Sequence, residues 1–163
     1  MRAAALTIST SKAAGDGEDE SGPQLETLAR ELGASALARE LIPDDRALIE
    51  ARLRHWADVA RCALVLTSGG TGLSPDDVTP EATRAVLDRE IPGIAEAMRL
   101  ASRAHTPHWM LSRALAGVRG RTLVVNLPGS PRAITEVSQE LAPALRHALA
   151  LIVEDASLEH RPR

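Results

Sequence analysis

The sequence predicts an α/β fold, a three-layer sandwich in which helices cover both faces of a mostly parallel sheet. Short apolar segments alternate with longer segments of helical periodicity along nearly the whole chain. Two of the apolar segments, 63–67 and 122–127, run directly into loops rich in glycine or proline that precede a helix start. Because parallel strands are joined by helical crossovers, this alternation favours a mostly parallel sheet.

The N-terminal elements follow in the order strand, loop, helix, strand, helix. A short strand over 3–9 precedes a polar, acidic loop, and Ser21 opens a Ser-x-x-Gln capping box for a helix that runs to Leu32. Residues 36–42 have helical propensity, yet the alternation of elements requires a strand there. Asp44 is well placed to cap the next helix, over 46–61.

The middle of the chain contains the strand over 63–67 and the glycine-rich loop that follows it. Thr79-Pro80-Glu81 supplies a capping residue, a first-turn proline and an acid for the next helix. Pro92-Gly93 interrupts that helix, and a further helix runs to about Ser102 before a loop over 103–109.

Two strands joined by a tight turn and one long helix complete the prediction. They are strands over 111–118 and 122–127, a helix over 132–153 that Pro143 breaks or bends, and a polar C-terminal tail over 154–163. We expect residues 1–153 to form a single domain.

The composition excludes several classes of protein. The chain has 163 residues, a net charge of −3 and two tryptophans as its only aromatic residues, so it lacks the basic surface and stacking platforms of nucleic-acid binders. Lys12 is the only lysine, which argues against Schiff-base chemistry and a Walker-type lysine. Cys62 is the only cysteine, so no intramolecular disulfide is possible. No segment predicts a membrane span, and we expect a cytoplasmic protein.

The loop after residues 63–67 carries the chemistry. It reads Ser68-Gly69-Gly70-Thr71-Gly72 and is followed closely by Asp76 and Asp77. Glycines allow several backbone N–H groups to converge on one anion, and carboxylates can hold a cation beside it. Asp76 and Asp77 could alternatively solvate the turn and cap the next helix. The combination of an oxyanion cradle with carboxylates favours phosphate-ester chemistry.

Four loops are predicted to meet at one edge of the sheet. They follow Ser9, Ile42, Thr67 and Leu127. In open α/β sheets, ligands bind outside the carboxyl ends of the strands, so these loops would share one site. Arg113, near the same edge, could pair with a phosphate or remain solvated.

Three motifs together resemble the molybdenum-cofactor biosynthesis family of molybdopterin adenylyltransferases, the MogA- and MoaB-type proteins. They are Thr67-Ser68-Gly69-Gly70-Thr71-Gly72, the segment from Asp77 to Thr83, and Asn126-Leu127-Pro128-Gly129-Ser130-Pro131. Ile42-Pro43-Asp44-Asp45 lies upstream in the order that the family shows. The resemblance extends from about Leu6 to Val153. Lys12 departs from the family pattern, which often has an aspartate in the first loop.

The resemblance implies the reaction of molybdopterin with ATP and Mg²⁺ to give adenylyl-molybdopterin and pyrophosphate. It implies Asp44 and Asp77 as catalytic, metal-binding residues, and it also implies a homotrimer and hand-over of product to a molybdate-inserting enzyme. The expected substrate-binding residues are Thr10, Ser11, Ser68, Gly69, Gly70, Thr71, Gly72, Asp76, Ser112, Asn126, Pro128, Gly129 and Ser130.

Two other functions remain open at this point. One is a non-catalytic protein that binds molybdopterin and passes it on. The other is a nucleotide-pyrophosphatase domain of the type found in competence/damage-inducible proteins, since Asp76-Asp77-Val78-Thr79 also fits the pattern of that domain. Thr71 and the loop from Asn126 to Pro131 favour the molybdopterin family over the pyrophosphatase domain.

Overall fold

The computed structural model describes residues 1–158 and confirms the predicted three-layer α/β sandwich. Its six-stranded sheet has the order β2-β1-β3-β6-β5-β4. The first four strands in this order are parallel, and β5 and β4 complete one edge in antiparallel pairing. The strands are β1 (Arg2–Ile8), β2 (Ala36–Ile42), β3 (Leu64–Ser68), β4 (Arg89–Glu90), β5 (Ala116–Arg119) and β6 (Thr122–Leu127).

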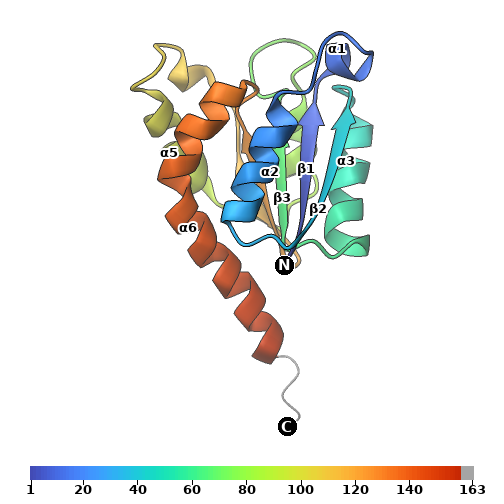
Figure 1. Cartoon of the computed structure of the whole chain (residues 1–163), viewed down its shortest axis with the longest axis vertical. Helices are drawn as coiled ribbons and strands as arrows, with labels where there is room; N and C mark the ends of the chain where they lie inside the picture. Colours follow the sequence, from blue (N-terminus) through green and yellow to red (C-terminus); the bar gives the residue numbers. More distant parts are fainter. Residues whose placement is uncertain (159–163) are drawn as a thin grey trace.

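Helices cover both faces of this sheet. They are α1 (Thr10–Ala13), α2 (Ser21–Glu31), α3 (Arg46–Arg54), α4 (Thr79–Arg84), α5 (Pro92–Ser102) and α6 (Pro131–Leu158). Buried residues of α2, α5 and α6 pack on one face of the sheet, whereas those of α3 and α4 pack on the other. Figure 1 shows α2 in front of the strands, with α6 beside it. None of the helices within 1–158 has the length and apolar character that a membrane crossing requires.

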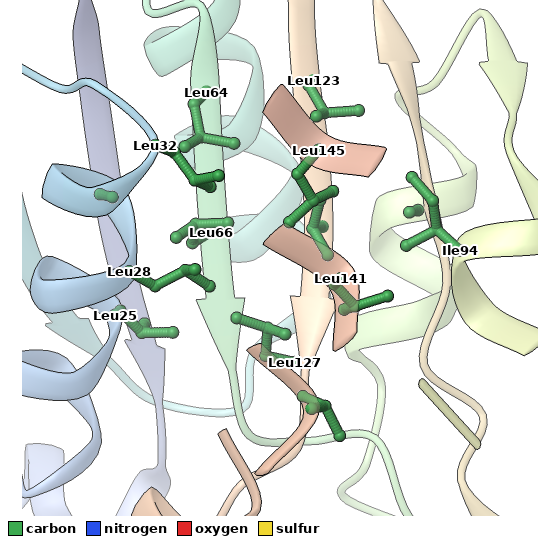
Figure 2. Packing of buried hydrophobic residues seen from close by; sticks show 14 of the residues in the cluster. Leu25, Leu28, Leu32, Leu64, Leu66, Ile94, Leu123, Leu127, Leu141 and Leu145 are labelled. Atoms are coloured by element: carbon green, nitrogen blue, oxygen red, sulfur yellow. The ribbon is translucent and has the colours of Figure 1, made fainter. Parts of the chain in front are cut away.

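Aliphatic side chains form the larger of the two cores. Leu28 of α2 and Leu141 of α6 point toward Leu66 on the central strand β3 and Leu127 on β6 (Figure 2). All four are at most 2% exposed. Strands β1, β3 and β6 are buried on both faces along almost their whole length, which is why their segments are largely apolar, whereas the edge strand β2 is only partly buried.

Most predicted elements are present, and the strand at 36–42 is confirmed despite its helical propensity. The parallel pairing of this segment with β1 explains the difference, because tertiary contacts outweigh weak local preferences. The first loop contains the short helix α1, which the sequence analysis missed. The helix predicted over 46–61 ends at Arg54 and continues as one π-helical turn, His55–Val59.

The region between α4 and β5 differs most from the prediction. The helix starting at Thr79 ends at Arg84, the edge strand β4 follows, and Pro92 begins α5 instead of interrupting a helix. Proline suits the first turn of a helix because its missing N–H would have no partner there. The predicted strand over 111–118 shortens to β5, after a 3₁₀ turn at Trp109–Leu111.

The last helix is longer than predicted and continues through Pro143. It extends to Leu158, so the first part of the predicted polar tail is helical. The remainder of that tail, 159–163, lies outside the described residues.

Three predicted capping side chains act differently. Asp45, instead of Asp44, accepts the N–H of Leu48 at the start of α3, at 2.7 Å. At α2, Asp19 instead of Ser21 accepts a first-turn N–H, that of Gly22. Thr79 makes no capping bond at α4. A side chain caps a helix only where the backbone just before the first turn points it at a free N–H group, and a sequence motif alone does not determine that backbone conformation.

Candidate active site

The predicted loops meet at the carboxyl edge of the parallel strands. Two adjoining cavities lie there, with volumes of about 260 and 500 Å³, and both are lined by Gly70, Asp77 and Gly129. The smaller cavity also contacts Asp44 and Lys12. The loops after β1, β2, β3 and β6 therefore border a continuous hollow, as the order of strands and loops in the sequence indicated.

Backbone conformation at the glycine-rich loop requires glycine at two positions. Gly69 has φ +103° and Gly70 has φ +62°. A Cβ on Gly69 would overlap the carbonyl oxygen of Ile8, and one on Gly70 would lie 2.9 Å from Asp44 Oδ1. The loop thus passes directly against the end of β1 and against the carboxylate that follows β2.

The amide N–H groups of this loop remain available for a ligand. Within residues 1–158, the N–H groups of Gly70, Thr71, Gly72 and Leu73 donate no hydrogen bond to another protein group. A run of backbone donors in a turn, without protein acceptors, forms a concave site for an anion. The loop therefore has the donors that the sequence analysis expected.

Asp44 is held by the loop after β1. Its Oδ2 accepts the N–H of Thr10 at 2.8 Å and the hydroxyl of Thr10 at 2.9 Å, while the Asp44 N–H donates back to that hydroxyl at 3.0 Å. This reciprocal pairing is possible because β1 and β2 are parallel neighbours in register from Arg2 with Ala36 to Ile8 with Ile42. The Oδ1 atom of Asp44 accepts no hydrogen bond from the described residues.

Asp77 has a similar arrangement on the other side of the loop. Its Oδ2 accepts the N–H of Ser74 at 2.8 Å and lies 2.9 Å from the position of a Cβ on Gly72. Its Oδ1 accepts no bond within 1–158. Each aspartate is therefore oriented through one oxygen and keeps the other for a ligand. The neighbouring Asp76 is exposed and lines neither cavity.

Two serines connect the loop after β6, which contains Pro128 and Gly129, to the rest of the site. Ser68 is 1% exposed and donates its hydroxyl hydrogen to the carbonyl of Pro128 at 2.8 Å. Ser21, which the sequence analysis had assigned to a helix cap, donates to the carbonyl of Gly129 at 3.0 Å. These bonds fix the loop after β6 against the end of β3 and the start of α2.

The structure separates the predicted site residues into two groups. Those that line one or both cavities are Asp44, Ser68, Gly69, Gly70, Thr71, Gly72, Asp77, Ser112, Pro128 and Gly129. Those that line neither are Thr10, Ser11, Asp76, Asn126 and Ser130. Thr10 acts on the site through Asp44.

Two residues of the second group have structural contacts. Asn126 is fully buried in β6 and donates through Nδ2 to the hydroxyls of Thr67 and Thr83, at 2.9 and 3.0 Å. Ser130 accepts the N–H of Ala133 at 3.1 Å at the start of α6. In a buried strand the alternating side chains face the two helical layers, and this places Asn126 beneath the site instead of within it.

The wall of the larger cavity consists of residues that no motif in the sequence indicates. Leu73, Met98, Trp109 and Leu111 contribute apolar surface to it. Such a wall, beside a few polar groups, suits a flat organic ring. The segment 103–109 is expected to be a loop and Leu111 to begin a strand, so only the folded chain brings Trp109 and Leu111 to the glycine-rich loop.

The site offers two carboxylates as possible metal ligands, those of Asp44 and Asp77. The described residues contain no group of three or more His, Cys, Asp or Glu side chains arranged for a metal. Two carboxylates with one unpaired oxygen each suit Mg²⁺ that arrives with a phosphate-bearing substrate, because Mg²⁺ usually keeps water and phosphate oxygens among its ligands.

Comparison with known proteins identifies a family of similar chains. A family model described as a probable molybdopterin binding domain matches residues 4–147. A molybdopterin adenylyltransferase of Helicobacter pylori is 38% identical over 150 residues, which cover 91% of this chain and 85% of that protein. The molybdenum cofactor synthesis protein cinnamon of Drosophila melanogaster is 42% identical over 154 residues, but this chain spans only 26% of its length.

A solved structure extends the likeness to three dimensions. The molybdopterin biosynthesis enzyme MoaB of Thermus thermophilus superimposes with a TM-score of 0.86 at 46% identity. The match covers 93% of this chain and 95% of that one.

Proposed function

Because this chain belongs to the family of probable molybdopterin-binding domains, we propose that it adenylylates molybdopterin in molybdenum cofactor biosynthesis. The terminal phosphate of molybdopterin would attack the α-phosphorus of ATP, and the bond to the β-phosphate would break to release pyrophosphate. One observation carries the proposal: Asp44 and Asp77, from different loops, flank a row of backbone N–H donors without a protein acceptor within 1–158, and each has one carboxylate oxygen that accepts no hydrogen bond from those residues.

The glycine-rich loop has the properties needed to bind the attacking phosphate. The N–H groups of Gly70, Thr71 and Gly72 have no protein acceptor within 1–158, and these residues border both cavities or the larger one. Donors fixed by the fold stabilise a charge without reorganising when it develops. We assign this loop to the phosphate and the apolar wall beside Trp109 to a ring system of a substrate.

Asp44 and Asp77 would hold Mg²⁺ through the oxygens that accept no hydrogen bond. Such an ion neutralises phosphate charge that otherwise repels the attacking oxygen. The bonds from Thr10 and Ser74 orient the two carboxylates before substrate arrives, which lowers the reorganisation that binding requires.

The test is formation of adenylyl-molybdopterin from molybdopterin, ATP and Mg²⁺ by the parent protein and by Asp77→Asn. The asparagine oxygen still accepts the N–H of Ser74, so the turn is retained while the charge is lost. We expect turnover to fall by about 10²–10³-fold, the usual loss for one transition-state electrostatic contact. Asp76→Asn is the matched control, because it removes the same charge from a side chain outside both cavities.

The outcomes separate the candidate functions. Tight molybdopterin binding without product would assign the protein to the carrier class. A protein that does not bind molybdopterin would instead favour the hydrolysis of a nucleotide pyrophosphate as its function. Full recovery of Asp77→Asn by added Mg²⁺ would show that the variant had only lost metal affinity.

Three features of the proposal come from the family resemblance alone: a homotrimeric assembly, a cytoplasmic location and hand-over of the product to a molybdate-inserting enzyme. The Mg²⁺ requirement comes from the resemblance together with the oxygens of Asp44 and Asp77 that accept no hydrogen bond within 1–158. Sedimentation of the purified protein tests the assembly, and omission of Mg²⁺ from the assay tests the metal.

A further inference from the structure

The guanidinium of Arg113 binds the glycine-rich loop and the turn that carries Asp77. Its Nε donates to the carbonyl of Gly72 at 2.7 Å, and its Nη2 donates to the carbonyl of Asp77 at 2.5 Å. The backbone N–H of Arg113 donates to the carbonyl of Thr71 at 3.0 Å. One residue thus fixes three carbonyl groups that are separated by up to six positions in the sequence.

The direction of these carbonyls determines the direction of the neighbouring amides. In a trans peptide the C=O and the following N–H point in opposite directions, and the described chain contains no cis peptide. Because the carbonyls of Thr71 and Gly72 point toward Arg113, the N–H groups of Gly72 and Leu73 point away from it. Both residues line the larger cavity, and neither N–H has an acceptor within 1–158.

Arg113 itself lies behind the loop. It lines neither of the two site cavities and borders a separate hollow together with Glu81 and Arg84. Its Nη1 pairs with Glu81 Oε1 on α4, so its charge is already partnered. This position does not fit direct phosphate binding, and the partners show that Arg113 is not simply solvated.

We propose that Arg113 is a positioning residue that turns the amides of the glycine-rich loop toward the substrate phosphate and keeps the Asp77 turn against that loop. The inference deepens the proposed function and rests on it for the identity of the phosphate. The planar fork of the guanidinium is required, because it donates in several fixed directions at once, whereas a lysine ammonium on its flexible stem cannot span the same acceptors.

The test compares Arg113→Lys and Arg113→Gln with the parent in the adenylyl-transfer assay, with kcat and the KM for ATP measured separately. Misplacing a catalytic group by about 1 Å costs on the order of 100-fold. We expect kcat to fall by about 100-fold in both variants. The KM for ATP changes far less, because the loop holds the attacking phosphate of molybdopterin and not the nucleotide. Arg84→Gln is the matched control. Arg84 lies on α4, the helix that also carries Glu81, and it forms an ion pair with Glu90 without contacting the loop.

Three results would overturn the inference. Parent-like kcat in Arg113→Lys would show that charge suffices. An equal fall in Arg84→Gln would show that any lost ion pair on α4 has the same effect. A rise in the KM for ATP without a fall in kcat would indicate that Arg113 binds the nucleotide directly. If Arg113→Gln does not fold, Arg113→Lys still decides between geometry and charge.

A binding measurement separates this inference from the proposed function. Titration calorimetry with inorganic pyrophosphate and Mg²⁺ reports on the anion site without any transfer step. If the parent forms no adenylyl product, the proposed function fails, but weaker pyrophosphate binding by both Arg113 variants, with parent-like binding by Arg84→Gln, still supports the positioning role. Unchanged affinity in the Arg113 variants would overturn it.

Discussion

Replacing Gly69 by alanine tests the close approach between the glycine-rich loop and β1. Gly69 has φ +103°, and a Cβ there would overlap the backbone carbonyl oxygen of Ile8. Gly33, after α2, has a similar φ of +95°, yet a Cβ there would meet nothing within 4 Å. Alanine at either position would be strained by the positive φ. Only at Gly69 would its Cβ also overlap the carbonyl oxygen of Ile8.

The expected losses of stability follow from these two terms. An L-residue at such a φ costs about 1–3 kcal/mol. Overpacking against a group that cannot move away costs about 1–3 kcal/mol more. The carbonyl of Ile8 belongs to β1, which is paired on both sides with β2 and β3, so it cannot shift without disturbing the ladder. We therefore expect Gly33→Ala to lose about 1–3 kcal/mol and Gly69→Ala about 2–6 kcal/mol.

Urea denaturation of the parent and both variants measures the difference through the transition midpoint and slope. Equal losses in the two variants would refute the reasoning, because the overlap with Ile8 would then contribute nothing. A loss at Gly69 without any loss at Gly33 would contradict the assigned cost of positive φ.

Two further predictions concern buried and exposed polar groups. Asn126→Ala removes the donor to two buried threonine hydroxyls, and we expect a loss of about 1–3 kcal/mol in the free energy of unfolding; a parent-like urea midpoint would contradict that role. Asp58 accepts a hydrogen bond from Arg119 Nη2 at 2.6 Å, and this bond lowers the pKa of the Asp58 carboxyl. Since the folded-state pKa is lowered, the stabilisation is present above the unfolded value of about 3.9 and disappears as pH falls through the folded value. Asp58→Asn should therefore be less stable than the parent near neutral pH by less than about 1 kcal/mol, because the pair is half exposed, and the gap in melting temperature should close in acid. A gap that widens as pH falls would contradict the assignment.

The sequence predicted the strand ends at which the site lies, because those signals are local. A glycine in a tight loop reports its own backbone requirement, and an apolar run reports its own burial. The same information assigned Asn126 to substrate binding, although the structure buries it beneath the site. A polar side chain at the end of a strand can point to either face of the sheet. Which of the two directions leads to the ligand depends on how the strand pairs with its neighbours.

By itself, the sequence determined the layered fold, the glycine-rich loop and the two aspartates that flank it. Only the tertiary structure decided how their neighbours are used. Asp44 is available to a ligand because Asp45 caps α3. Arg113 donates to the carbonyl of Gly72, which lies 41 residues earlier in the chain. Side-chain partners of this kind depend on distances between loops that parallel strands bring together, and no local pattern encodes those distances.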